Sequence, residues 1–291
     1  MPAAVASSVA SSVASLAVPH RHGRGPLLAL ATAASALAAA GGAPLAAQTP
    51  APAAAPDRPP DVVFVPTPME VVHTMLAVTR VGPRDVVYDL GCGDGRIVVT
   101  AAKRHGARGV GVDIDPNRIA DSRHNVDTSG VKGRVEIRQG DLFTMDLRPA
   151  TVVTLYLLPR LNVQLRPRLY EQLRPGTRVV SHAFDMGDWE ADSTISVEGR
   201  TVYYWVMPAN VAGRWTVTPA GGRPYTMELE QQYQRARGTA TVNGRATPVQ
   251  NVRLVGNRIT LTANGVTLTG RVTGDTMSGG QGASAWQAKR G

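Results

Sequence analysis

Hydrophobic and polar positions follow two different periods in the central part of the chain. Runs with the character of strands stand at 86–89, 109–115, 135–141, 151–159 and 177–184. These runs predict strands, and the apolar run at 151–159 is typical of a central strand in a parallel sheet. Between the runs, apolar residues recur every three or four positions, as at Leu161, Leu165 and Leu169, which predicts helices. Strands that alternate with helices predict an α/β fold with a doubly wound, Rossmann-like sheet.

The pattern changes after the fifth run. Residues 195–197 and 201–206 flank Glu198-Gly199-Arg200 and predict a hairpin that completes a seven-stranded sheet. From Gly213 onward, short alternating runs stand at 215–218, 225–231, 238–242, 252–255, 258–262, 266–272 and 285–288. Turns such as Asn243-Gly244 between such runs are strong hairpin signals. This part predicts a small antiparallel β meander that curls into a sandwich or barrel.

These patterns divide the chain into four parts. Residues 1–47 contain no acid, a basic stretch at 20–24 and an apolar core at 26–40, which predicts a signal peptide. An uncleaved membrane anchor is the alternative, although a membrane span needs ~20 apolar residues. Residues 48–60 predict a Pro/Ala linker, 61–208 the α/β domain and 209–291 the all-β domain. This leader, residues 1–47, predicts a periplasmic or membrane-associated protein.

The folded part opens on Thr67-Pro68-Met69-Glu70. Thr67 as N-cap, Pro68 at the first helical position and Glu70 at the third position match a capping box. We therefore expect a helix that starts here and is capped by the Thr67 side chain.

Composition limits the function classes. One cysteine and six scattered histidines exclude an intramolecular disulfide and predict no metal cluster. The net charge of +9 comes largely from the all-β part, whereas residues 48–208 hold nineteen basic and nineteen acidic residues. An enzyme that acts on nucleic acid usually carries basic surface beside its active site. We therefore expect no nucleic-acid partner.

The candidate chemistry starts at the end of the first strand, with Asp89-Leu90-Gly91-Cys92-Gly93-Asp94-Gly95-Arg96. A dinucleotide-binding loop reads G-x-G-x-x-G, and here Arg96 stands in place of the third glycine. The acids Asp89 and Asp94 flank the loop and suit a cationic ligand better than a pyrophosphate. Cys92 has no neighbouring His or Lys and is interpreted as a small packed side chain.

This stretch resembles motif I of the class I S-adenosylmethionine-dependent methyltransferases. The resemblance implies that the methionine end of the cofactor is held by the acids and glycines of the loop, namely Asp89, Gly91, Gly93, Asp94 and Gly95. Asp113 ends the second strand near the spacing of about 20 residues at which an acid binds ribose hydroxyls. Asp115 precedes Pro116 and predicts a helix cap. The resemblance further places Asp141 beside the adenine and Thr67 against the cofactor.

Residues 61–190 resemble bacterial relatives of the protein-lysine methyltransferases that modify the ATP synthase c-ring protein and the adenine nucleotide translocase. The resemblance is carried by Phe64-Val65-Pro66, the glycine loop through Val98, Asp115-Pro116 and Phe184-Asp185-Met186-Gly187-Asp188-Trp189. It implies methyl transfer to a lysine of a protein substrate, with S-adenosylmethionine as cofactor. The sequence departs from the family at Cys92, at Asp113-Ile114-Asp115 and in its β tail.

Five residues at the carboxyl ends of the fourth and fifth strands are candidates for the acceptor side: Tyr156, His182, Asp185, Asp188 and Trp189. Tyr156 and Trp189 are expected to line a lysine channel. Asp185 or Asp188 is expected to orient the amine, and His182 is either a proton acceptor or a hydrogen-bonded core histidine.

The predicted leader and the predicted cofactor disagree, because S-adenosylmethionine is made in the cytoplasm. A cytoplasmic location therefore stays open. One alternative function is a non-enzymatic, exported ligand-binding protein on a methyltransferase scaffold. Another is a small-molecule methyltransferase that uses the β domain as a lid.

Overall fold

The structure is a computed structural model that describes residues 59–291. The predicted leader and nearly all of the predicted linker lie outside the described residues. Within residues 59–291, no helix has both the length and the apolar character needed to cross a bilayer.

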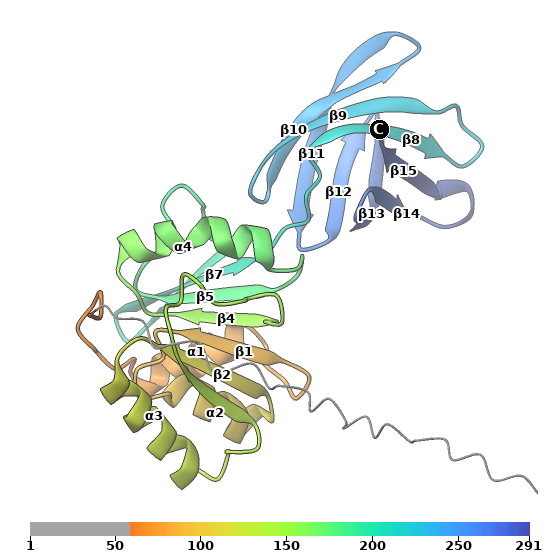
Figure 1. Cartoon of the computed structure of the whole chain (residues 1–291). Coiled ribbons are helices and arrows are strands. Elements are labelled where there is room, and N and C mark those ends of the chain that lie inside the picture. The colour runs from red at the N-terminus through yellow and green to blue at the C-terminus, as the bar shows by residue number, and fades with distance from the viewer. Residues whose placement is uncertain (1–58) are drawn as a thin grey trace, which may run out of the picture. The chain divides into compact units, whose positions relative to one another are not determined.

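The first half of the described chain forms one seven-stranded mixed sheet (Figure 1). Its strands are β1 Val86–Leu90, β2 Arg108–Asp113, β3 Val135–Gln139, β4 Val152–Leu155, β5 Arg178–His182, β6 Ser193–Val197 and β7 Arg200–Val206. Their order is β3-β2-β1-β4-β5-β7-β6, in which β1 to β5 are parallel and β7 runs antiparallel to both β5 and β6. The predicted doubly wound sheet with a closing hairpin is confirmed.

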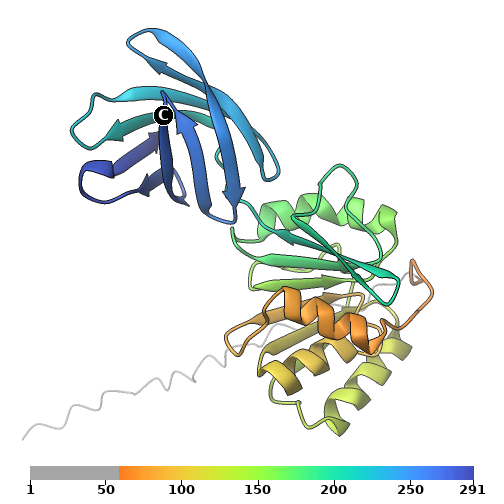
Figure 2. The same cartoon turned by 180° about the vertical axis from the view of Figure 1, so that it is seen from behind.

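Helices cover both faces of this sheet. They are α1 Met69–Val78, α2 Arg96–His105, α3 Pro116–Thr128 and α4 Pro159–Gln172. Alternate residues of β1 face opposite sides of the sheet. Val87 packs with α1 and α2, whereas Tyr88 and Leu90 pack with the leucines of α4. Accordingly, α4 lies in front of the sheet in Figure 1 and α1 lies in front of it in Figure 2. Because β1, β2 and β4 run parallel, their carboxyl ends lie at the same edge of the sheet.

One predicted helix cap is wrong and one is confirmed. The N-cap of α1 is Pro68, and no side chain caps this helix. Thr67 is buried instead, and its hydroxyl lies 3.4 Å from Nδ1 of His182 on β5. In α3, Asp115 is the N-cap and accepts a hydrogen bond from the Asn117 amide, with Pro116 at the first helical position.

The second half forms a closed antiparallel barrel of eight strands. They are β8 Gly213–Pro219, β9 Tyr225–Gln232, β10 Arg235–Val242, β11 Arg245–Val255, β12 Arg258–Ala263, β13 Val266–Thr273, β14 Thr276–Gly279 and β15 Trp286–Arg290. Alternate inward side chains, among them Trp215, Met227 and Trp286, fill its interior. The barrel prediction is confirmed, but the sequence patterns missed β14, because its four residues carry only one large apolar side chain, Met277.

Candidate active site

The glycine loop after β1 has the backbone that its sequence requires. Gly91, Gly93 and Gly95 have φ angles of +80°, +55° and +73°, in the left-handed region that other residues avoid. The amides of Gly91 and Cys92 both donate to the carbonyl of Val112 at the end of β2, at 2.8 and 2.9 Å. The loop is therefore fixed against the neighbouring strand before α2 begins at Arg96.

Asp89 is a buried carboxyl directly below this loop. The residue is only 2% exposed, and its Oδ1 accepts a hydrogen bond of 2.7 Å from the Thr154 hydroxyl on β4. Burial raises the pKa of Asp89 to about 7 against the effect of this hydrogen bond, and the charges of Asp113 and Asp94 raise it further. A cationic ligand beside Asp89 would therefore favour its ionised form.

Asp113 connects the end of β2 to the glycine loop. Its Oδ2 accepts from the Gly93 amide at 2.8 Å and its Oδ1 accepts from the Asp115 amide at 3.0 Å. Burial raises the pKa of this carboxyl, and backbone hydrogen bonds act against that rise. The two bonds orient Asp113 at the edge of the pocket.

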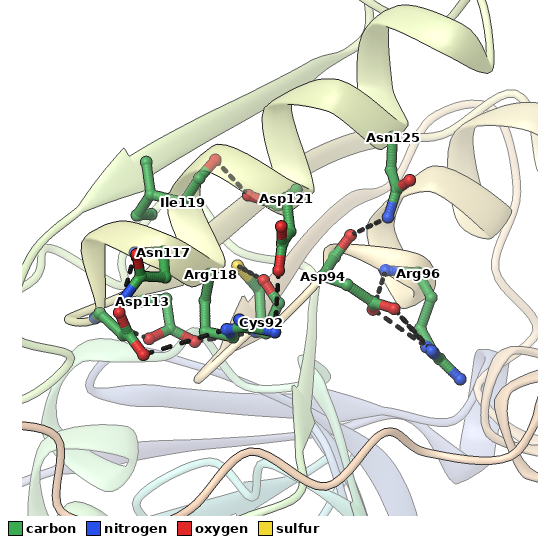
Figure 3. Close-up of polar contacts among 12 residues, drawn as sticks. Cys92, Asp94, Arg96, Asp113, Asn117, Arg118, Ile119, Asp121 and Asn125 are labelled. Carbon is green, nitrogen blue, oxygen red and sulfur yellow. Dashed lines mark hydrogen bonds and ion pairs between the residues drawn. The ribbon is translucent and has the colours of Figure 1, made fainter.

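Asp94 links three segments that are distant in the sequence. Its carboxylate accepts from Nε of Arg96 at 2.9 Å, and Nη1 of Arg96 donates to the Thr67 carbonyl at 3.0 Å. Nδ2 of Asn125, on α3, donates to the Asp94 carbonyl at 2.9 Å, as Figure 3 shows. Arg96, oriented by Asp94, therefore holds the chain before α1 against the start of α2.

These groups surround a pocket at the carboxyl edge of the sheet. Most of the predicted cofactor residues line it, namely Thr67, Asp89, Gly91, Asp94, Asp113 and Asp141. The ring of Phe64 lies on Gly93: a Cβ added at Gly93 would stand 2.1 Å from a ring carbon. The guanidinium of Arg118 lies 4.8 Å from the centre of the same ring. Phe64 and Arg118 both line the pocket.

Three rings gather where β4 and β5 end. The ring centres of Tyr156 and His182 are 3.9 Å apart, and those of Tyr156 and Phe184 are 6.2 Å apart. Tyr156 also lines the pocket. Burial, and then the charge of Arg200, lower the pKa of His182 to about 4, so this ring is neutral at pH 7.

Comparison with known proteins identifies the family. The ANTKMT methyltransferase domain family matches residues 89–193. A protein-lysine N-methyltransferase of Saccharolobus islandicus (strain REY15A) is 46% identical over 153 residues, which cover 51% of this chain and 95% of that protein. The chain belongs to the protein-lysine N-methyltransferase family.

Two further relatives agree on methyl transfer. The mouse (Mus musculus) lysine N-methyltransferase named for the C-type subunit of ATP synthase is 32% identical over 161 residues, covering 55% of this chain and 62% of that protein. A crystal structure described as an RNA methyltransferase from Salinibacter ruber, in complex with S-adenosylhomocysteine, is 58% identical, with a TM-score of 0.50; the match covers 50% of this chain and 96% of that one. The protein is thus an S-adenosylmethionine-dependent methyltransferase, which favours an enzyme over a non-enzymatic scaffold.

The methyltransferase does not bring all predicted acceptor residues to the pocket. Asp185 is exposed and accepts from the Gly187 amide at 3.0 Å, and Asp188 forms an ion pair with Arg166. Trp189 is only 1% exposed, packs in the core beside α4 and donates from Nε1 to Oε1 of a barrel residue, Gln234, at 2.9 Å. Of the five candidates, Tyr156 lines the pocket and His182 contacts its ring.

The sequence patterns do not reveal several residues of the methyltransferase site. Phe64 contributes to the family resemblance, but nothing in its neighbourhood indicates that its ring rests on Gly93. Arg118 and Thr154 lie in ordinary helical and strand patterns, which carry no signal for a site. Burial raises the pKa of the Cys92 thiol well above its usual value, in keeping with a packed side chain. Within residues 59–291 there is no group of three or more His, Cys, Asp or Glu side chains that could hold a metal.

Proposed function

We propose that this methyltransferase transfers a methyl group to the ε-amine of a lysine in a protein substrate. The observation that carries the proposal is the cluster of rings beside the cofactor pocket: Tyr156 and Phe184, with the buried His182 behind Tyr156, offer an uncharged surface at the strand ends. The 46% identical protein-lysine methyltransferase supports the same acceptor class.

The residues of the pocket fit S-adenosylmethionine. When bound, this cofactor supplies a methyl group activated by a sulfonium. The carboxyl of Asp89 and the open backbone of Gly91 suit its cationic amino-acid end, Asp113 suits the ribose hydroxyls, and Asp141 suits the adenine. A set of carboxyls around a glycine loop matches a ligand with an ammonium and a sulfonium better than it matches a pyrophosphate.

On the acceptor side, the chain has to keep the lysine amine neutral and in place. A surface of rings withdraws the amine from water, and desolvation lowers the pKa of a lysine. A pKa of about 4 makes His182 a weak base at neutral pH, so its role is to support the Tyr156 ring and to bind Thr67. Positioning and desolvation, rather than proton abstraction by His182, are the contributions we assign to this surface.

Removing the Tyr156 hydroxyl tests this assignment. Tyr156→Phe keeps the ring against His182 and is expected to lower kcat about tenfold, because the amine loses a polar contact that holds it in line. The dissociation constant for S-adenosylhomocysteine should stay within about twofold, measured by calorimetry. Tyr204→Phe, on β7 and away from the pocket lining, is the matched control and should retain full activity. A kcat equal to wild type would remove Tyr156 from the acceptor side.

The acceptor class itself is tested with labelled cofactor. The purified protein is incubated with methyl-labelled S-adenosylmethionine and cell extract, with protein, RNA and small molecules then separated. Label is expected in protein, as methylated lysine after complete hydrolysis. Because a 58% identical structure is described as an RNA methyltransferase, the RNA fraction is the key alternative. Label that ribonuclease removes, or label confined to small molecules, would overturn the lysine proposal.

A further inference from the structure

The barrel touches the methyltransferase domain at two turns: Gly256, between β11 and β12, packs against Gly176, and the turn between β9 and β10 contacts the segment after β5. We call residues 231–235, between β9 and β10, the barrel turn, and residues 183–190, after β5, the post-β5 segment. Gln234 bonds this segment twice: Oε1 accepts from Nε1 of Trp189 at 2.9 Å, and Nε2 donates to the Glu190 carbonyl at 2.7 Å. The ring of Tyr233 stacks on Trp189, with centres 5.1 Å apart and planes 11° apart. Arg235 forms an ion pair with Glu190.

The barrel turn has residues that a free hairpin would not favour. Gln232 pairs with Arg235, so the turn itself is Tyr233-Gln234. Tyr233 has φ +52°, a conformation that is unfavourable for a bulky residue. Other hairpins of the barrel place Asn-Gly at such positions, as at Asn243-Gly244, which is the usual solution. A strained tyrosine is retained where its contacts compensate for the strain, and here the ring contacts Trp189 and Tyr170 and lies 5.4 Å from the Arg166 guanidinium.

Further bonds make the barrel turn rigid. The Gln231 side chain accepts from the Val211 amide at 2.6 Å and donates to the carbonyls of Ala209 and Tyr233 at 2.9 and 2.6 Å. It also lies 3.3 Å from the Tyr170 hydroxyl on α4. The turn is thereby tied both to the connection that leads into the barrel and to the helix beneath Trp189.

The other end of the post-β5 segment lies beside Tyr156, which lines the pocket. Phe184 stacks beside Tyr156. Nδ2 of Asn162, on α4, donates to the carbonyls of Phe184 and Asp185 at 3.1 and 3.0 Å. Only four residues separate Phe184 from Trp189. A displacement at Trp189 is therefore transmitted over a short, bonded stretch to the ring beside Tyr156.

We infer that the barrel turn is a positioning element for the acceptor side of the active site, in which Gln234 and Tyr233 hold Trp189 and Glu190 and so fix Phe184. The inference rests on the proposed function, because the acceptor is what Phe184 and Tyr156 would contact. The match to the ANTKMT domain family ends at residue 193, before the barrel begins at Gly213. The barrel turn is therefore not part of the matched domain, although it contacts that domain.

The test compares three variants of the full chain with a matched control. Gln234→Ala removes both side-chain bonds and Tyr233→Ala removes the stacking. Tyr233→Phe keeps the stacking and loses only the exposed hydroxyl, which lies 3.4 Å from Oδ2 of Asp188. Gln287→Ala, an exposed barrel glutamine on β15, is the control. In Gln234→Ala and Tyr233→Ala, kcat/KM for the protein acceptor should fall about tenfold, while the dissociation constant for S-adenosylhomocysteine stays within about twofold. Tyr233→Phe and Gln287→Ala should match wild type.

Hydrogen exchange gives a second readout that needs no acceptor. Gln234→Ala should speed amide exchange in residues 184–190 several-fold and leave the glycine loop unchanged. Unchanged exchange in this segment, or an equal loss of cofactor affinity and acceptor activity, would overturn the inference. If the wild-type protein methylates no lysine, the proposed function fails, yet the exchange result still decides whether the turn fixes the segment.

Discussion

Replacing Asp89 with Asn is expected to weaken cofactor binding at least about a hundredfold and at the same time to stabilise the protein. Burial raises the pKa of Asp89 to about 7, which means that the folded state disfavours the ionised carboxyl. The folded-state pKa is above the unfolded value, so the folded protein binds more protons between about pH 4 and pH 7, and the free energy of unfolding falls as pH rises through that window. An Asn at pH 8 avoids this cost and still offers an oxygen to the Thr154 hydroxyl.

The size of both effects follows from the same raised pKa. A rise from the ordinary value of an aspartate to about 7 corresponds to at most ~4 kcal/mol, so Asp89→Asn should raise the free energy of unfolding at pH 8 by ~1–4 kcal/mol. Thermal unfolding measures this change. Calorimetry should show S-adenosylmethionine affinity reduced at least about a hundredfold, because the ammonium loses its charged partner. Cofactor affinity of the wild-type protein should also increase from about pH 6 to about pH 8, as Asp89 ionises.

Asp85 provides the control of opposite sign. Burial opposes its ionisation, but hydrogen bonds from Thr151, the Gly82 amide and Arg178 lower the pKa of this carboxyl overall. Its ionised form therefore stabilises the fold above the unfolded pKa, and that stability is lost as pH falls. Asp85→Asn should lower the melting temperature and leave cofactor affinity unchanged. An Asp89→Asn protein that still binds the cofactor normally would contradict the assignment of this acid.

The features that the sequence predicted correctly are those encoded in short segments. The glycine loop has positive φ angles at Gly91, Gly93 and Gly95, which only glycine adopts freely. The local sequence is therefore enough to predict the conformation of the loop. The doubly wound sheet was predicted from strands that alternate with helices, because helical connections between parallel strands leave few topologies. The acids Asp89, Asp113 and Asp141 reach one pocket for the same reason: parallel strands end at one edge.

The features that the sequence did not predict depend on contacts between distant segments. The pattern around Thr67 is the same whether its hydroxyl turns toward the helix or toward His182, which is 115 residues away in the sequence. Trp189 stands in a segment that does reach the active site, but its partner, Gln234, belongs to the barrel. The packing of Phe64 on Gly93 depends on how the chain returns over the loop, which no periodicity encodes.

Gly93→Ala should lower cofactor affinity more than a glycine-to-alanine substitution at any other position of the loop. Gly93 has φ +55°, which costs an alanine about 1–2 kcal/mol, and the new Cβ would stand 2.1 Å from the Phe64 ring. The ring has to leave its place beside Arg118, and the Gly93 amide moves away from Asp113. We expect cofactor affinity to fall at least about a hundredfold, measured by calorimetry.

A double-mutant cycle separates the steric part of this loss from the backbone part. Phe64→Ala in the Gly93→Ala background removes the clash, so the double variant should recover part of the affinity and show a coupling of ~1–3 kcal/mol. Gly130→Ala is the control for the backbone part, because Gly130 has φ +70° and nothing within 4 Å of an added Cβ; it should lower stability and leave cofactor affinity intact. If Phe64→Ala and Gly93→Ala are additive instead, the Phe64 ring does not rest on Gly93 in solution and does not border the pocket there.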